Sequence, residues 1–227
     1  MIERLNDIKK RIINAALSCG RNPEEIKVVA VSKTMPIEKV KEAINAGAVI
    51  FGENYIQESR EKITELSAYP VSWHFIGHLQ SNKAKYAVKY FDVIHTVDSL
   101  KLAAIINREA VKIGKVQDIL IQVNTGMESS KSGTLSDETL DLVKKISVFT
   151  NLRIDGLMTI PPLYNEPERV APYFSMLREL RDSIKSENIS NVYMDELSMG
   201  MTGDFEVAIK EGATIVRIGT AIFGKRK

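Results

Sequence analysis

The sequence predicts an α/β protein built as a single (β/α)8 barrel, and three observations support this fold class. Eight short runs rich in apolar and β-branched residues recur along the chain, and segments with helical periodicity separate them. Several of the runs are almost continuously apolar, which is typical of parallel strands buried on both faces. A doubly wound open sheet is the competing architecture. Eight units in 227 residues leave little room for a separate domain, which favours the barrel and one domain over residues 1–227.

The predicted elements follow one another in the order that a barrel requires. The strands are expected at residues 27–33, 48–54, 72–77, 92–98, 118–124, 153–160, 192–198 and 214–220. A helical segment at 36–47 begins with Pro36, placed at the first helical position, and closes on Gly47. Another at 136–150 begins with Ser136 and has acidic residues in its first turn and lysines later, which matches the helix dipole. Further helices are expected at 99–114, 167–186 and 204–212, and an extra helix at 1–17 precedes the first strand.

Composition and charge exclude several classes of protein. The 31 Lys and Arg residues against 29 Asp and Glu residues give a formal net charge of +2, too small for a sequence-independent nucleic-acid binder. The single cysteine, Cys19, excludes an intramolecular disulfide framework and a cysteine-rich zinc site. No apolar run approaches the roughly 20 residues that span a bilayer, and the N-terminus lacks the apolar segment of a signal peptide. We therefore expect a soluble, cytoplasmic protein that binds neither membranes nor nucleic acids.

Polar residues and glycines gather where the predicted strands end. In a (β/α)8 barrel, the functional residues lie at the carboxyl ends of the strands. Those ends carry Lys33, Asn54, Gly77, His78, Asp98, Asn124, Met158, Thr159, Ser198, Gly219 and Thr220. The strand interiors are mostly Val, Ile, Leu and Phe, so this concentration is the main functional signal of the sequence.

Lys33 is the most informative of these residues. It follows the run VVAVS, so we expect it at the end of the first strand, above the mouth of the barrel. A lysine desolvated there has a lowered pKa and acts as a nucleophilic amine that forms a Schiff base with an aldehyde. The alternative is a lysine whose ammonium group simply reaches solvent, and the position alone favours this alternative.

The last two units of the barrel shift the balance towards a ligand. Residues 198–202 lie between the seventh strand and a helix, and Gly219 and Thr220 end the eighth strand. Loops at these two places, with a helix N-terminus, commonly hold phosphate in such barrels. Small residues let backbone amides approach the phosphate, and hydroxyl groups donate to its oxygens. Turn chemistry alone explains either loop, but both loops together with Lys33 indicate a phosphorylated aldehyde as the ligand.

Other titratable residues receive structural interpretations. His74 and His78 flank a strand end with no nearby carboxylate or cysteine to complete a metal site, so no metal is expected. His95 is interpreted as a core or strand-end histidine. Glu53 and Glu58 are candidates for an acid pair, although Glu58 is better explained as the start of a solvated helix.

Seven motifs together resemble a known family. VAVSK, FGENYIQE, WHFIGHLQSNK, SKSG, GLMTI, LSMGMTGDF and VRIGTAIFG occur in this order from Lys33 to Gly224. In this order they resemble the YggS/PROSC family of pyridoxal 5′-phosphate (PLP) homeostasis proteins, and the likeness covers nearly the whole chain. The resemblance implies a fold similar to the N-terminal barrel domain of bacterial alanine racemase, with PLP as the cofactor.

The resemblance also implies roles for individual residues. Lys33 would hold PLP as a Schiff base. Ser198, Gly219 and Thr220 would bind the phosphate, and Arg217 would face the pyridine nitrogen. The other assignments are Asn54 near the ring, the looser pocket residues His78, Met158, Met199, Gly200 and Met201, and Lys131 as a possible second amine.

Two functions from different classes are compatible with such a site. The first is a carrier that holds, buffers and delivers PLP, expected to be a monomer with apo-PLP enzymes as transient partners. The second is an amino-acid racemase, which needs a base on each face of the substrate. An arginine beside the pyridine nitrogen makes the ring a weaker electron sink, and only three residues follow Gly224, so we expect no second domain to supply the second base. The missing second base and the open face of the cofactor favour the carrier, although Tyr55, Tyr164 and Tyr173 are available as substitutes.

Overall fold

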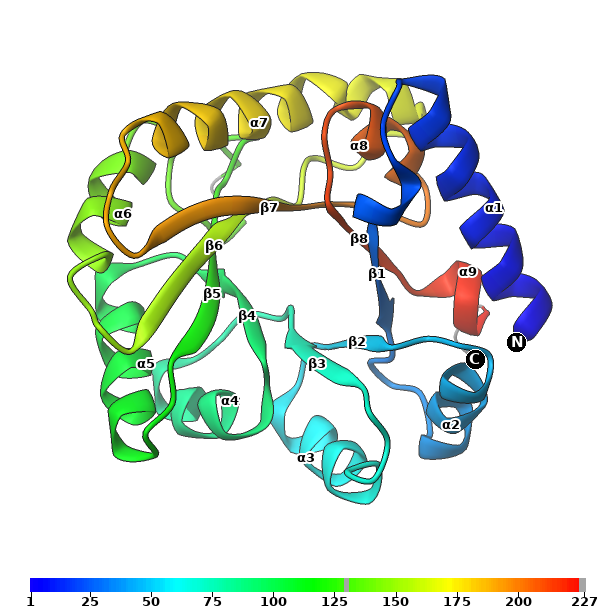
Figure 1. Cartoon of the computed structure of the whole chain (residues 1–227), viewed down its shortest axis with the longest axis horizontal. Helices are drawn as coiled ribbons and strands as arrows, with labels where there is room; N and C mark the ends of the chain where they lie inside the picture. The colour runs from blue at the N-terminus through cyan, green and yellow to red at the C-terminus, as the bar shows by residue number, and fades with distance from the viewer. Residues whose placement is uncertain (129–130, 225–227) are drawn as a thin grey trace.

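Eight parallel strands close into a barrel in the computed structural model, which describes residues 1–128 and 131–224. Consecutive strands pair in parallel all the way round the sheet. The last strand, β8 (Ile215–Ile218), pairs in parallel with the first, β1 (Lys27–Val31), and this pairing closes the barrel. Figure 1 shows the ring of strands with the helices outside it. The predicted barrel is confirmed, and the open sheet is wrong.

All eight strands fall on the predicted runs. The other six are β2 (Ile50–Glu53), β3 (Ser72–Phe75), β4 (Val93–Val97), β5 (Gln117–Gln122), β6 (Leu152–Met158) and β7 (Val192–Met201). The main difference is that β7 continues past its predicted end at Ser198 to Met201. Gly200 permits this, because its φ of +88° is strained for other residues and a Cβ there would lie 2.5 Å from the Ala208 Cβ. Ser198 therefore belongs to the barrel wall, and the loop after β7 begins at Thr202.

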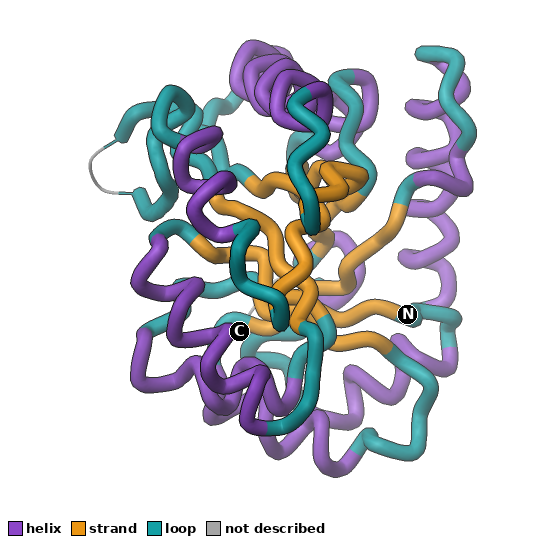
Figure 2. Tube along the Cα trace, turned by 60° about the vertical axis from the view of Figure 1, so that its left-hand side comes forward, coloured by secondary structure: helices purple, strands orange, loops and turns teal. Residues whose placement is uncertain are grey.

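Helices cover the outside of the barrel, as Figure 2 shows from a second direction. They are α1 (Ile2–Ser18), α2 (Ile37–Asn45), α3 (Ile56–Glu65), α4 (Ala84–Tyr90), α5 (Leu100–Lys112), α6 (Thr139–Ile146), α7 (Ala171–Ser186), α8 (Phe205–Lys210) and α9 (Thr220–Phe223). Three predicted helix starts differ most clearly. Pro36 is the N-cap of α2 and not its first residue, Ser136 lies in a turn before α6, and residues 167–170 form a 3-10 helix before α7. No helix in the described part of the chain is long and apolar enough to cross a membrane.

The predicted extra helix, α1, lies beside α8 and α9 next to the strands that close the barrel (Figure 1). Its buried face carries Leu5, Ile8 and Ile12 at helical spacing. Next to this face, Arg11 Nε donates to Glu206 Oε1 of α8 at 2.7 Å. Apolar packing and this ion pair together hold α1 against the barrel.

The barrel interior contains a compact apolar layer. Val29, Leu120, Met158 and Ile215 form one buried cluster although they come from four different strands, so they meet inside the ring. Met158, predicted as a pocket residue, is fully buried in this layer. This layer supports the polar residues at the carboxyl ends of the strands.

Candidate functional site

The carboxyl-terminal end of the barrel holds a cavity of about 500 Å³. Six residues predicted from the sequence line it, namely Lys33, Asn54, Met201, Arg217, Gly219 and Thr220. Arg217 lies within β8 and Met201 is the last residue of β7. The other four lie just beyond the ends of β1, β2 and β8. Because β1 and β8 are neighbours only in a closed barrel, the fold brings together residues from opposite ends of the chain.

Lys33 lies in the turn after β1, and buried groups hold the residue before it. Ser32 is fully buried, and its hydroxyl donates to Glu53 Oε1 at 2.7 Å. Its carbonyl oxygen accepts from Lys62 Nζ of α3 at 2.7 Å. Lys62 and Glu53 also form a buried ion pair, with 2.8 Å between Nζ and Oε1. Burial raises the pKa of Glu53, and the Lys62 ammonium opposes that shift.

The same network holds the residue after Lys33. The Thr34 N–H donates to Glu58 Oε1 at 2.5 Å, and this oxygen is also 2.5 Å from Lys62 Nζ. Thr34 has a φ of +64°, a left-handed conformation that costs a residue with a Cβ about 1 kcal/mol. Glu53 and Glu58, considered above as an acid pair, therefore share one ammonium group. The network fixes the strained turn on both sides of Lys33.

Asn54 places an unsatisfied acceptor at the cavity wall. Its Oδ1 atom is buried and has no hydrogen-bond partner among the residues that the structure describes. Gly77 lets the Asn54 backbone come close to the segment that follows β3, because a Cβ at position 77 would lie 2.4 Å from the Asn54 carbonyl oxygen. A buried acceptor without a donor costs about 1–3 kcal/mol. A ligand that offers a donor would remove this cost.

Two short segments next to each other in the barrel complete the cavity. Residues 202–203 follow β7, and Gly219 follows β8 and leads into Thr220, the first residue of α9. Asp204 Oδ1 accepts from the Met201 N–H at 2.5 Å, which fixes the start of the first segment. Apart from its two chain neighbours, no described residue has an atom within 4 Å of the place where a Cβ on Gly203 would stand, so a ligand can approach its backbone closely. Thr202 adds a hydroxyl beside it.

The relationship of the chain to known proteins is close over its whole length. The family model of the alanine racemase N-terminal domain matches residues 7–227. A pyridoxal phosphate homeostasis protein from Aquifex aeolicus (strain VF5) is 46% identical over 225 residues, which are 99% of this chain and 98% of that protein. The chain belongs to the family of pyridoxal phosphate homeostasis proteins.

Solved structures of this and a more distant family share the fold. PipY from Synechococcus elongatus PCC7942, solved with PLP bound, is 34% identical with a TM-score of 0.82 over 96% of this chain and 100% of that one. An alanine racemase from Clostridium difficile 630 has a TM-score of 0.76 at 15% identity, over 99% of this chain and 57% of the racemase. The second likeness concerns the fold alone. The resemblance inferred from the seven motifs is confirmed.

Several residues predicted for the PLP site of this homeostasis-family chain do not line the cavity. Met158, Ser198 and Met199 are fully buried, and Gly200 packs against α8. His78 is exposed, has its Nδ1 3.3 Å from Ser132 Oγ, and lines a neighbouring cavity of about 440 Å³ that also includes Asn54.

The extra length of β7 is the reason for three of these placements, because it keeps residues 198–200 in the wall. Thr202, the last residue of the predicted phosphate loop, does line the cavity, and Gly203 beside it was not predicted.

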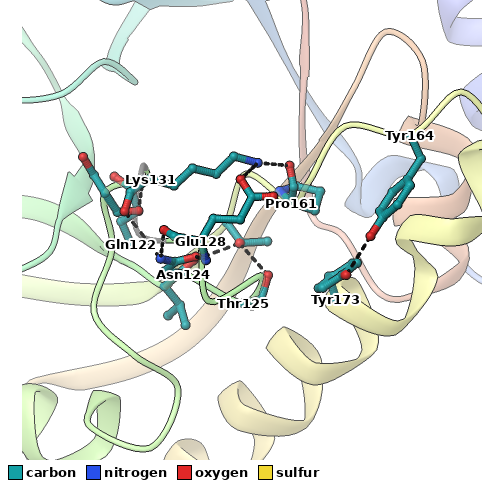
Figure 3. A network of polar contacts seen from close by, with 11 residues as sticks. Gln122, Asn124, Thr125, Glu128, Lys131, Pro161, Tyr164 and Tyr173 are labelled. Atoms are coloured by element: carbon teal, nitrogen blue, oxygen red, sulfur yellow. Dashed lines mark hydrogen bonds and ion pairs between the residues drawn. The ribbon is translucent and has the colours of Figure 1, made fainter.

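Lys131, the predicted second amine of the homeostasis-family site, lies in the connection between β5 and α6. Its Nζ donates to the Pro161 carbonyl oxygen at 2.8 Å and is 3.1 Å from Glu128 Oε2 (Figure 3). These contacts join the connection to the loop after β6, and Lys131 does not line the cavity. Ser130, the first residue of the SKSG motif, lies outside the described residues. A role for Lys131 as second amine stays a prediction.

A tyrosine pair stands at the cavity wall of this family member. Tyr164 lines the cavity, and its hydroxyl is 2.8 Å from that of Tyr173, with the rings stacked 6.2 Å apart (Figure 3). The hydrogen bond raises the pKa of Tyr173. Each hydroxyl is therefore engaged with the other.

Two histidines pair inside the barrel of this homeostasis-family chain. His74 Nδ1 is 2.8 Å from His95 Nε2, and burial lowers the pKa of His74 to about 4 and that of His95 well below its ordinary value. His78, considered with His74 as a metal pair, is exposed and does not join them. Within the described residues, no three His, Cys, Asp or Glu side chains are grouped to hold a metal ion.

We expect this pair to make the protein acid-sensitive. Below pH 6.5 the unfolded chain protonates His74, whereas the folded chain keeps it neutral until about pH 4, so protonation favours unfolding. The contribution of His74 to the free energy of unfolding should fall by about 3 kcal/mol between these pH values. Urea titrations of the wild type and His74→Asn from pH 8 to pH 4.5 measure this change in the free energy of unfolding. Parallel curves for the two proteins would contradict the assignment.

Proposed function

We propose that this protein binds PLP in the cavity, holds it as a Schiff base on Lys33, and buffers or delivers it within the cell. The observation that carries the proposal is the meeting of Lys33, Arg217 and the unsatisfied Asn54 acceptor around one cavity. The name of the Aquifex relative and the PLP-bound PipY structure support it.

The residues present fit PLP by their chemistry. An amine, Lys33, suits the aldehyde; a buried cation, Arg217, suits an aromatic nitrogen acceptor; and the buried Asn54 Oδ1 suits a hydroxyl donor. The open backbone at residues 202–203 and 219–220 suits the phosphate. When bound, PLP supplies a reactive aldehyde and an electron-accepting ring.

The carrier role is favoured over the racemase role by the names of the close relatives, and Arg217 limits the electron-withdrawing power of the bound ring. Burial lowers its pKa only to about 10, so the guanidinium stays charged at neutral pH. A cation that only donates leaves the ring nitrogen unprotonated, and the ring then withdraws electrons less strongly. The close relatives are named for homeostasis, while the likeness to alanine racemase concerns the fold.

The proposed covalent site is tested on purified protein incubated with PLP. We expect a yellow protein whose absorption band disappears with borohydride, and mass spectrometry should locate the reduced adduct on the peptide that contains Lys33. A colourless protein with no adduct would contradict the proposal.

Delivery is tested by transfer to an apo-PLP enzyme, which we expect to be activated by the loaded protein while the free PLP concentration stays low. Chiral analysis after incubation with single-enantiomer amino acids tests the racemase alternative, and turnover above that of free PLP would favour it. A cytoplasmic location, a monomeric state and a single domain over residues 1–227 belong to the same proposal, and cell fractionation, sedimentation and limited proteolysis test them.

A further inference from the structure

A chain of buried polar groups crosses the barrel interior and ends at the cavity. Arg217 NH1 donates to Ser198 Oγ at 2.7 Å, and Ser198 Oγ is 2.9 Å from His95 Nδ1. His95 Nε2 in turn is 2.8 Å from His74 Nδ1. None of the four residues is more than 5% exposed. They stand on β8, β7, β4 and β3, so the chain connects opposite sides of the ring.

The direction of these hydrogen bonds follows from the donors and acceptors available. An arginine only donates, so Ser198 Oγ accepts from Arg217. The Ser198 hydroxyl proton then needs an acceptor, and among the described residues only His95 Nδ1 is within reach. His95 therefore carries its proton on Nε2 and donates to His74 Nδ1. Both imidazoles must be neutral for this arrangement, and their burial keeps them so.

Arg217 is a buried cation that neutral groups hold. Its NH2 donates to the Thr159 carbonyl oxygen at 2.9 Å, and in the described part of the chain it takes part in no ion pair. The Asp204 carboxylate favours the charge from beyond ion-pair distance. A buried charge without a carboxylate in direct contact is costly unless hydrogen bonds fix and solvate it. Arg217 also lines the cavity, and a guanidinium has five N–H donors, so donors remain for a ligand.

We propose that Ser198 is a positioning residue whose hydroxyl, oriented by His95 and His74, holds the Arg217 guanidinium where it meets an acceptor atom of the ligand's aromatic ring. This inference rests on the proposed function, and it replaces the phosphate-binding role predicted for Ser198 from the sequence. Ser198 does not line the cavity, and its hydroxyl is already engaged with two side chains. Thr202, which does line the cavity, is the hydroxyl available to the phosphate.

Binding of PLP compared with binding of pyridoxal distinguishes a role of Ser198 in positioning Arg217 from a role in binding the phosphate. PLP and pyridoxal share the ring and the aldehyde, and only PLP has the phosphate. Ser198→Ala is expected to weaken binding of both by a similar factor, about tenfold, because a hydrogen bond to a charged group is lost. Thr202→Ala is expected to weaken PLP binding and leave pyridoxal binding nearly unchanged. Absorption titrations of the full chain give the dissociation constants, and the ratio of variant to wild type is compared for PLP and for pyridoxal.

Spectra of bound PLP test positioning independently of stability. Ser198→Ala and His95→Gln should shift the absorption band in the same way, and the double variant should shift it no further. Ser198→Thr, which keeps the hydroxyl, should restore the wild-type band. If His95→Gln does not fold, the comparison of Ser198→Ala with Ser198→Thr decides the question.

The possible outcomes are distinct. Equal weakening of both ligands by Ser198→Ala, with a shifted band, supports positioning. Weakening of PLP alone would make Ser198 a phosphate ligand and overturn the inference, and so would unchanged binding of both ligands. If the wild type binds neither ligand, the proposed function itself fails. If the wild type binds both ligands and only the Ser198 results differ from those expected, the inference alone fails.

Discussion

Replacement of Lys33 with alanine is expected to abolish the covalent attachment of PLP completely. Alanine has no amine to attack the aldehyde. Borohydride treatment followed by peptide mass spectrometry should then find the reduced adduct in the wild type and none in Lys33→Ala. Contacts to the phosphate and the ring do not depend on the amine, so equilibrium dialysis should still detect weaker, non-covalent binding.

Two other lysines serve as comparisons for this result. Lys39→Ala changes an exposed lysine on α2 that pairs with Glu42 at 2.8 Å, and it should retain the full adduct. Lys131→Ala tests the predicted second amine, whose Nζ already donates to Pro161 O. A wild-type amount of adduct on any lysine of Lys33→Ala would show that the attachment site is elsewhere.

Replacement of Lys62 with methionine is expected to be strongly destabilising. The substitution removes the ammonium but keeps most of the apolar stem, so the carboxylate of Glu53, which is 0% exposed, loses its cation. Breaking one side of a buried ion pair typically costs about 3–5 kcal/mol. We therefore expect the free energy of unfolding, measured with urea, to fall by about this amount. PLP binding should weaken too, because the Ser32 carbonyl loses its donor and Glu58, which accepts from the Thr34 N–H, loses its cation.

The matched control is Lys41→Met. Lys41 also contacts a carboxylate of α3, that of Glu65 at 2.8 Å, but this pair is exposed, so its loss should have only a small effect on stability. The double variant Lys62→Met/Glu53→Gln should recover part of the lost stability, since it removes the unpaired charge. Equal stability of Lys62→Met and Lys41→Met would refute the importance of the buried pair.

The position of Ser198 shows where prediction from sequence stops. The run before it has the apolar pattern of a strand, and the strand is where the pattern puts it. The end of the strand is not where the pattern predicts it. β7 continues to Met201 through Gly200, whose close approach to Ala208 is set by the packing of α8. Periodicity along one strand contains no information on that packing. The resemblance therefore assigned the phosphate to Ser198, whereas in the structure Thr202 lines the cavity.

Lys62 is a second example, and the sequence carries no signal for it beyond its spacing from Glu58. On a helical wheel it belongs to a charged helix and would be assigned to the surface. The structure turns it inward because α3 packs where β1 and β2 end, so that its ammonium reaches Ser32 and Glu53. A contact between a helix and the turn of another strand requires the tertiary arrangement.

By itself, the sequence determined the number and order of the strands, most of the helices, the lysine after the first strand, and the family to which the chain belongs. These follow from local periodicity and from motifs read in order, both of which are properties of neighbouring residues. Only the tertiary structure decided which polar residues face the cavity, because each position in a strand end can turn inward or outward with a shift of one residue. It also decided that Arg217 is held through Ser198 and two neutral histidines, since these residues meet only where four strands face one another across the ring.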